Sequence, residues 1–264
     1  MIMNTMFDVQ KIAAELAAAE KNKCQIAPLT ETFPAMTVED AYAVQLENVR
    51  ARLAAGEKLV GMKIGLTSKA VQKMLGVDEP DYGHLFDSML VGEGQPCCMK
   101  GLIQPKVEGE LAFRLGRTLK GPGITLADVY AATEYVIPSI EIVDSRILNW
   151  KITLRDTVAD NGSAARFILG GRMRPVEAVD MRLTGMTLEK NGCLLSSGAT
   201  AEVWGNPAAA VAWLANKLGG FGIDLPEGSI VLAGAVTAMA TVTPGDSITV
   251  SFHGMNSVTA VFTE

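Results

Sequence analysis

Soft metal ligands are scarce in this chain. It has two histidines, His84 and His253, and four cysteines among 264 residues. The cysteines show neither a CxxC pair nor the mixed Cys/His spacing of a zinc site, so we interpret them as reduced thiols. A histidine-rich zinc centre is not expected either. If the protein binds a metal, the ion should therefore be a hard cation held by oxygen.

Excess basic charge and long apolar runs are also missing. The formal net charge is −6, which argues against nucleic acid and anionic membrane surfaces as partners. No apolar run approaches the roughly 20 residues that a membrane helix needs. Residues 1–23 lack the basic start and apolar block of a signal peptide. We therefore expect a soluble cytoplasmic protein. No GxGxxG or GxxxxGKS/T motif opens a helix, which leaves little support for nucleotide binding.

The first part of the chain has helical periodicity. Residues 7–23 repeat alanine, leucine and isoleucine at helical spacing. Thr37, with Asp40 three positions later, predicts an N-capped helix that runs to about Ala54 and stops at Gly56. We expect residues 1–58 to form an N-terminal helical segment packed on the core.

Strand-like patterns dominate the rest of the chain. Several segments alternate apolar with polar residues, as half-buried strands do. The predicted strands span 59–67, 107–115, 135–143, 165–171, 183–192, 229–236, 246–254 and 257–263. Helices are predicted at 68–76, 126–135 and 207–222, and a turn rich in Asp, Pro and Gly at 78–83. The fold class is therefore α+β with mostly antiparallel sheet. We expect residues 59–264 to form a β-rich domain, which would be the catalytic domain if the protein is an enzyme.

Three glutamates occur within apolar strand patterns. Glu108 and Glu110 are two positions apart, so a strand places both carboxylates on one face, and Gly109 between them leaves the backbone easy to approach. Glu141 follows 31 residues after Glu110 between two isoleucines. Converging carboxylates repel one another unless a divalent cation neutralises them, and oxygen ligands suit Mg²⁺ or Mn²⁺. Spacing alone leaves this open against the alternative that the glutamates line the solvent side of exposed strands.

Long segments resemble one known family. VGMKIGLTSKAVQKMLGVDEPDYG (60–83), IQPKVEGELAF (103–113), YVIPSIEIVDSRILNWK (135–151) and DTVADNGSAARFILGG (156–171) are similar to the 2-oxopent-4-enoate hydratase and 4-oxalocrotonate decarboxylase family, within the fumarylacetoacetate hydrolase superfamily. The similarity covers nearly the whole chain. It implies a fumarylacetoacetate-hydrolase-like mixed β roll with N-terminal helices, assembled into homo-oligomers, and a complex with a sister pathway enzyme is a further expectation. It also implies that Glu108, Glu110 and Glu141 bind Mg²⁺ or Mn²⁺.

The resemblance also implies roles for other residues. Lys63 would lie near the substrate carboxylate or transfer protons, Asp81 would be a general acid/base, and Ser163 would hydrogen-bond substrate or water. Without the resemblance, Lys63 is a strand-end lysine that reaches solvent, and the other two are turn residues. The backbone at Leu66 and Thr67 is expected to contact the substrate carboxylate. If Arg166 faces the pocket, we expect it to pair with a second carboxylate of the substrate. Asp144, Arg146 and Asp160 are expected to form supporting salt bridges.

The implied activity is that of a lyase of aromatic meta-cleavage catabolism acting on a small 2-oxo or 2-hydroxydienoic acid. We favour hydration of 2-hydroxypenta-2,4-dienoate (2-oxopent-4-enoate) to 4-hydroxy-2-oxopentanoate, because segments 79–83, 148–161 and 189–198 look more like the hydratases. The alternative is decarboxylation of 4-oxalocrotonate to 2-hydroxypenta-2,4-dienoate, since 166–171 and 235–250 resemble decarboxylases. Acylpyruvate hydrolysis, for which His84 is the only nearby base, and a non-catalytic binding protein are less favoured.

Overall fold

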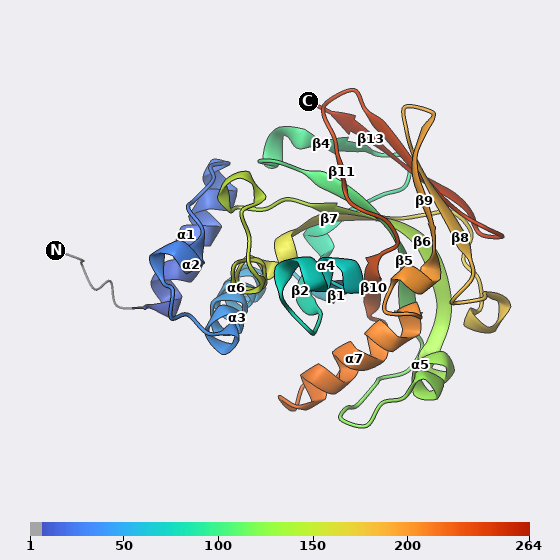
Figure 1. Ribbon diagram of the computed structural model, residues 1–264, viewed down its shortest axis with the longest axis horizontal. Helices are drawn as coiled ribbons and strands as arrows, with labels where there is room; N and C mark the ends of the chain where they lie inside the picture. Colours follow the sequence, from blue (N-terminus) through green and yellow to red (C-terminus); the bar gives the residue numbers. More distant parts are fainter. Residues whose placement is uncertain (1–6) are drawn as a thin grey trace.

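The computed structural model describes residues 7–264 (Figure 1). The first six residues, which belong to the predicted helical segment and to the stretch without a signal-peptide pattern, lie outside the described residues. Across residues 7–264, no helix combines the length and apolar character needed to cross a bilayer.

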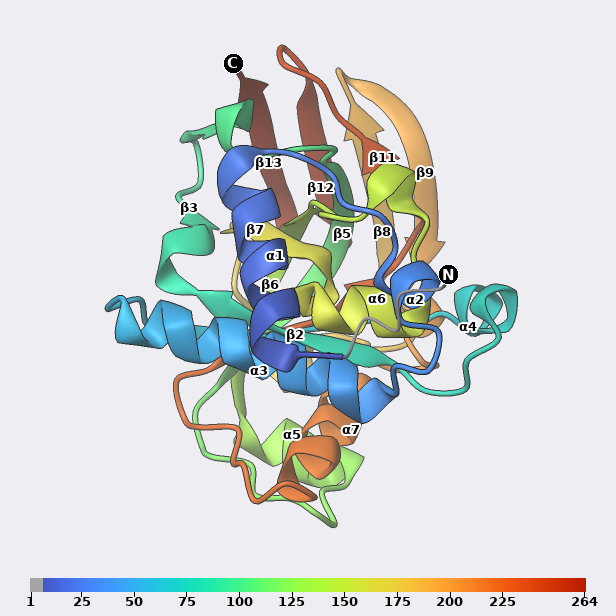
Figure 2. The ribbon, with the colours of Figure 1, turned by 90° about the vertical axis from the view of Figure 1, so that its left-hand side faces the viewer.

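Both predicted N-terminal helices form, and a short unpredicted helix lies between them in the sequence. Helix α1 spans Val9–Asn22, α2 spans Leu29–Thr32 and α3 spans Val38–Ala54. The predicted Thr37–Asp40 capping box begins α3, since each side chain of the pair accepts a hydrogen bond from the backbone of the other. Helix α3 packs against α1 and against α6 (Leu154–Ala159), as Figure 2 shows.

The large sheet is the centre of the molecule. Its strand order is β2-β1-β10-β5-β6-β7-β3, with β11 paired to β5. Neighbours are antiparallel except β1 with β10 and β3 with β7. The strands span Leu59–Gly65 (β1), Asp81–Phe86 (β2), Leu90–Val91 (β3), Lys106–Leu115 (β5), Thr133–Val143 (β6), Ala164–Leu169 (β7), Ile230–Ala235 (β10) and Ala240–Thr241 (β11).

A second sheet covers part of one face of the large sheet. Its order is β4-β13-β12-β8-β9, with bounds Pro96–Cys98, Asn256–Thr263, Ser247–Phe252, Gly185–Lys190 and Cys193–Ala199. A Cβ at Gly109 of β5 would lie 3.0 Å from Val250 and 3.2 Å from Met186 of this sheet. Gly109, which lies between Glu108 and Glu110 on β5, therefore allows the two sheets to pack closely on the face opposite the glutamates.

Helices close the remaining surfaces. Helices α5 (Leu126–Ala132) and α7 (Pro207–Gly219) contact each other at the lower right of Figure 1, while α1–α3 lie on the left. Helix α4 (Lys69–Leu75) follows β1. Short 3-10 turns are η1 Asp87–Met89, η2 Met99–Gly101, η3 Leu148–Trp150, η4 Asn161–Ser163, η5 Val176–Ala178 and η6 Thr200–Glu202.

The α+β expectation is confirmed, although several elements differ from the prediction. The short elements α2, α6, β3, β4 and β11 were not predicted. Residues 81–83 were predicted within a turn, and this is wrong: they begin β2 and pair with β1. Only glycine fits at position 83 of this strand, because a Cβ there would lie 2.2 Å from the carbonyl oxygen of Asn161. No local pattern reveals this contact. Strand β9 was not predicted because both faces of its first three residues are exposed, which removes the alternation.

Candidate metal centre

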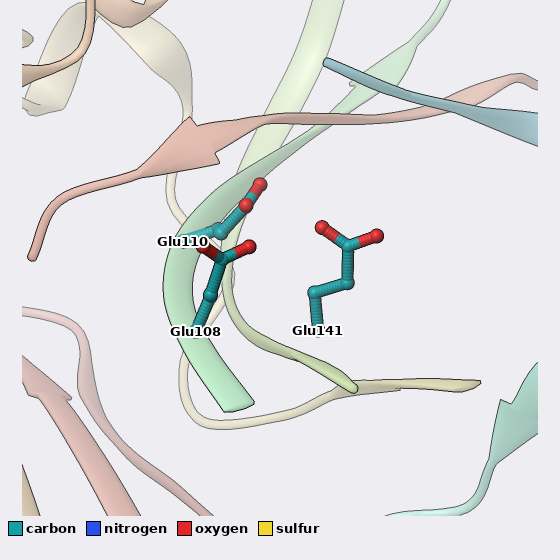
Figure 3. Close-up of side chains that lie close together, drawn as sticks. All are labelled: Glu108, Glu110 and Glu141. Carbon is teal, nitrogen blue, oxygen red and sulfur yellow. The ribbon is translucent and has the colours of Figure 1, made fainter. Parts of the chain in front are cut away.

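Strand pairing brings the three glutamates together. Strands β5 and β6 are antiparallel, and Glu108 lies directly opposite Glu141, with Glu110 opposite Ser139. Directly paired residues share a face of the sheet, so all three carboxylates project from the same side. One oxygen from each lies within 4.8 Å of the others (Figure 3).

The cluster is buried and short of hydrogen-bond donors. Glu110 and Glu141 are 1% and 0% exposed, and Glu108 is half-buried. Glu110 Oε2 accepts a hydrogen bond from the Gly234 amide at 2.8 Å. Neither carboxylate oxygen of Glu141 has a hydrogen-bond donor among residues 7–264. Buried polar atoms normally have a partner, so these oxygens indicate a ligand.

Burial and mutual repulsion shift the glutamate pKa values. Burial raises the pKa of Glu141 to about 7, against the lowering effect of Lys63. Burial, together with the charges of Glu141 and Glu108, raises the pKa of Glu110 well above its ordinary value. An oxygen-ligated divalent cation would remove this repulsion and give the unpartnered oxygens a ligand. The residues present therefore fit such a cation.

Lys63 lies beside the cluster and does not reach solvent. It is opposite Leu232 of β10, which is opposite Ala112 of β5, so it shares the glutamate face. The side chain is 5% exposed, and its ammonium lies 3.0 Å from the carbonyl oxygen of Gly162 and 3.4 Å from Glu141 Oε2. Burial lowers the pKa of Lys63, but the carboxylates of Glu141 and Asp81 outweigh it and raise the pKa above the ordinary value.

Asp81 joins the same cluster from β2. It pairs with Gly65, two residues after Lys63, and a Cβ at Gly65 would lie 2.1 Å from Asp81 Oδ1. Asp81 Oδ2 accepts a hydrogen bond from the Thr157 hydroxyl at 3.3 Å, and Oδ1 has no donor within the described part of the chain. Burial raises the pKa of Asp81, with Lys63 opposing it. Asp81 is therefore a buried carboxyl with one uncommitted oxygen.

The other predicted substrate-binding positions lie around this face. The buried hydroxyl of Ser163 finds no partner within residues 7–264. A Cβ at Gly234 would lie 2.2 Å from Thr67 Oγ1, so Thr67 packs against the glycine whose amide binds Glu110. Leu66 has a φ of 56°, an uncommon conformation for leucine, and its carbonyl oxygen accepts a hydrogen bond from Gln72.

Arg166 is not brought to the glutamates. It pairs with Ile142, the neighbour of Glu141 on β6, and therefore projects from the opposite face. Its guanidinium donates a hydrogen bond to the carbonyl oxygen of Ala165 at 2.7 Å. The expectation that Arg166 contacts a substrate carboxylate gains no support from this geometry.

Comparison with known proteins identifies the family. A model of the fumarylacetoacetate (FAA) hydrolase C-terminal domain matches residues 53–263. The chain belongs to the fumarylacetoacetate hydrolase family. It is 48% identical to a 2-hydroxyhexa-2,4-dienoate hydratase of Comamonas testosteroni, over 90% of this chain and 91% of the relative. It is 52% identical to a 2-hydroxypent-2,4-dienoate hydratase of Pseudomonas putida, over 81% and 97%.

A solved member of the fumarylacetoacetate hydrolase family has the same fold. The 4-oxalocrotonate decarboxylase of Pseudomonas putida G7, complexed with magnesium and adipate, superposes with a TM-score of 0.94 at 45% identity and covers 96% of this chain and 97% of the relative. The predicted family and its mixed β roll are confirmed.

Sequence reasoning missed Thr157 and Asn161. The Thr157 hydroxyl binds Asp81, and Asn161 connects β2 to the turn that contains Ser163. The Asn161-Gly162 pair is a left-handed turn signal and was available in the sequence, whereas the contact of Thr157 with a residue 76 positions away was not.

Proposed function

We propose that this protein is a divalent-metal-dependent lyase that hydrates 2-hydroxypenta-2,4-dienoate, or a close analogue, to 4-hydroxy-2-oxopentanoate. The two hydratases at 48% and 52% identity support this substrate class. The observation that carries the hydratase assignment is the uncommitted Asp81 oxygen, in the same buried cluster as Lys63 and the glutamates.

Glu108, Glu110 and Glu141 would hold Mg²⁺ or Mn²⁺. Their convergence within 4.8 Å supports this assignment, and so do the oxygens of Glu141, which accept no hydrogen bond. The magnesium bound by the solved relative supports it as well. When bound, the cation would supply Lewis-acid stabilisation of negative charge on the 2-oxygen of the substrate.

Lys63, Ser163 and the backbone at Leu66 and Thr67 would orient the substrate. The raised pKa of Lys63 keeps it cationic, which suits a contact with the carboxylate of a 2-oxo acid. Ser163 offers a buried hydroxyl able to donate or accept a hydrogen bond. We leave Arg166 out of this set because of its strand position.

Asp81 would carry the protons. Hydration first moves the proton of the 2-hydroxyl group to C5, which gives a conjugated enone. Water then adds across C3 and C4, with its hydroxyl at C4 and its other proton at C3. Both steps need a group that takes and returns a proton. Burial raises the pKa of Asp81, against the lowering effect of Lys63, which favours a carboxyl that can hold a proton.

Decarboxylation of 4-oxalocrotonate is the second candidate, supported by the solved relative of that name at 45% identity. The two substrates should be supplied separately with Mg²⁺ or Mn²⁺ and the products identified. We expect 4-hydroxy-2-oxopentanoate from the dienoate. Release of CO₂ from 4-oxalocrotonate without hydration of the dienoate would overturn the hydratase assignment.

Assembly and location are further parts of the proposal. Exposed Leu194 and Leu195 on the edge strand β9, which are 64% and 54% exposed, support a homo-oligomer. Light scattering after gel filtration would measure its size. A complex with a sister pathway enzyme, the cytoplasmic location and the division of the chain at residue 58 stay predictions.

A further inference from the structure

Three consecutive residues between α6 and β7 have left-handed backbone conformations. Asn161, Gly162 and Ser163 have φ values of 56°, 60° and 55°. We call these residues the Asn161 turn. Left-handed conformations are unfavourable for L-residues other than glycine and, to a lesser degree, asparagine. A run of three persists only where surrounding contacts impose it.

The Asn161 turn delivers two groups to the glutamate face. The carbonyl oxygen of Gly162 accepts the hydrogen bond from Lys63 at 3.0 Å, and a Cβ at Gly162 would lie 3.0 Å from the Lys63 side chain. The unpartnered hydroxyl of Ser163 follows in the next residue. The position of the turn therefore sets the positions of both Lys63 and Ser163.

One side of the turn borders a cavity. Asp160, Asn161 and Ala164 line a cavity of about 360 Å³ between the turn and helices α1 and α3. On this side the turn has few side chains packed against it, so hydrogen bonds contribute to its restraint. One of them runs from the Asp144 amide to the Ser163 carbonyl oxygen at 2.8 Å. Asp160, at one end, is bound by the Arg146 backbone and guanidinium.

Asn161 supplies the restraint toward the sheet. Its Oδ1 accepts a hydrogen bond from the His84 amide at 2.8 Å, and its Nδ2 donates one to the His84 carbonyl oxygen at 3.0 Å. Strand β2 is at the edge of the large sheet, so this side chain pairs with the edge as a neighbouring strand would. Gly83 permits the approach, since a Cβ there would lie 2.2 Å from the Asn161 carbonyl oxygen.

We propose that Asn161 is a positioning residue for the reaction: its paired hydrogen bonds to β2 fix the Asn161 turn, and the turn fixes the Lys63 ammonium and the Ser163 hydroxyl. The inference rests on the proposed function for its catalytic consequence. Its structural part, that the side chain holds the turn, is testable without any substrate.

The test uses Asn161→Gly, which keeps a left-handed backbone accessible and removes only the side chain. Hydrogen–deuterium exchange of the metal-free protein should become faster at residues 160–164 and 82–86. With dienoate, kcat should fall on the order of 10- to 100-fold, because displacing a positioned group by about 1 Å has that effect. Mn²⁺ affinity should stay within about threefold of wild type, since no metal ligand is changed, and kcat should fall by a larger factor than KM rises. Asn161→Asp keeps the acceptor for the His84 amide and should give an intermediate kcat.

Asn216→Ala is the matched control. Asn216 also binds backbone through both side-chain atoms, accepting from the Gly123 and Ile124 amides at 2.7 Å and donating to the Ile124 carbonyl oxygen at 2.9 Å. Its loss should leave kcat unchanged. Unchanged exchange at 160–164 in both Asn161 variants would overturn the structural part, whatever the substrate. Faster exchange with wild-type kcat on an accepted substrate would overturn the positioning role. Wild-type protein inactive on the dienoate would contradict the hydratase assignment alone.

Discussion

Two groups of buried acids in this molecule differ in how their charges are satisfied. Asp160 forms an ion pair with Arg146 and also accepts hydrogen bonds from the Arg146 amide and the Ser145 hydroxyl. The Arg146 guanidinium in turn donates to the carbonyl oxygens of Asp144 and Asp160. The predicted supporting salt bridge is therefore present for Arg146 and Asp160. Asp144 instead accepts hydrogen bonds from the amides of residues 103 and 104.

The glutamate cluster lacks this network. Glu108, Glu110 and Glu141 converge, yet in the described chain Glu141 has only an ion pair between its Oε2 and the Lys63 ammonium, at 3.4 Å. A buried charge with a full set of partners supports the fold, whereas buried like charges without them oppose it. The difference indicates that the first group serves stability and the second serves ligand binding.

Replacing a cluster glutamate should have the largest effect on activity and little effect on stability. Glu108→Gln or Glu141→Gln removes one anionic ligand and should abolish turnover while the protein stays folded. Metal affinity should fall about 10-fold or more, on the order of 1.4 kcal/mol. Mn²⁺ at about 100 times the wild-type Kd should stabilise wild type by roughly 2.7 kcal/mol, but a variant with 10-fold weaker affinity by only about 1.4 kcal/mol. The rise in melting temperature should therefore be about half as large, or smaller, in the variants.

Glu134→Gln is the control for this substitution, because Glu134 is an exposed glutamate on the same strand β6. It should retain activity and the response to Mn²⁺. Wild-type activity that survives thorough chelation would refute the metal assignment.

Asp81→Asn should have the next largest effect on activity. The amide keeps the size of the side chain but cannot carry a proton, so hydration should fall about 10²- to 10⁴-fold. Metal binding should persist, since Asp81 is not a proposed ligand. Decarboxylation of 4-oxalocrotonate, if it occurs, should change little. Unimpaired hydration in the variant would remove Asp81 from the mechanism and leave the hydratase assignment standing.

The paired acids should show the reverse pattern, a loss of stability. Asp160→Asn leaves the buried Arg146 charge without its counter-ion and should lower the free energy of unfolding by about 3–5 kcal/mol. Urea denaturation measures this change. Asp224→Asn breaks the exposed pair with Lys120 and should change the unfolding free energy by less than about 1 kcal/mol. Similar values for the two variants would erase the proposed distinction.

The last prediction concerns His84, a buried group that belongs to neither set of acids, and the dependence of stability on pH. Burial lowers its pKa to about 4, from an ordinary value of 6.5. The folded state then binds fewer protons than the unfolded state, so stability contributed by neutral His84 is complete above pH 6.5 and is lost as pH falls toward 4. The loss is roughly 3 kcal/mol at most. The melting temperature of His84→Gln relative to wild type should therefore rise between pH 6.5 and 4. A constant difference would contradict the shifted pKa.

Much of the fold followed from local pattern. The Thr37–Asp40 cap and the alternating strands formed where predicted, because capping and the pleat depend on residues only a few positions apart. The strand at Asp81 did not follow, because it forms by pairing with β1, which no local pattern reveals. The hydrogen bonds of Asn161 to His84 did not follow either, because they join segments more than 70 residues apart. Local propensity carries no information about such contacts.

By itself the sequence determined that Glu108 and Glu110 share one face, since a strand repeats every two residues. Only the tertiary structure decided that Glu141 lies opposite Glu108, because strand register is set by which apolar faces pack together. The same packing decided that Asp81 and Lys63 meet the glutamates and that Arg166, on an adjacent strand, faces away. Residue types specified the available chemistry, and the register of distant strands selected which of them share a site.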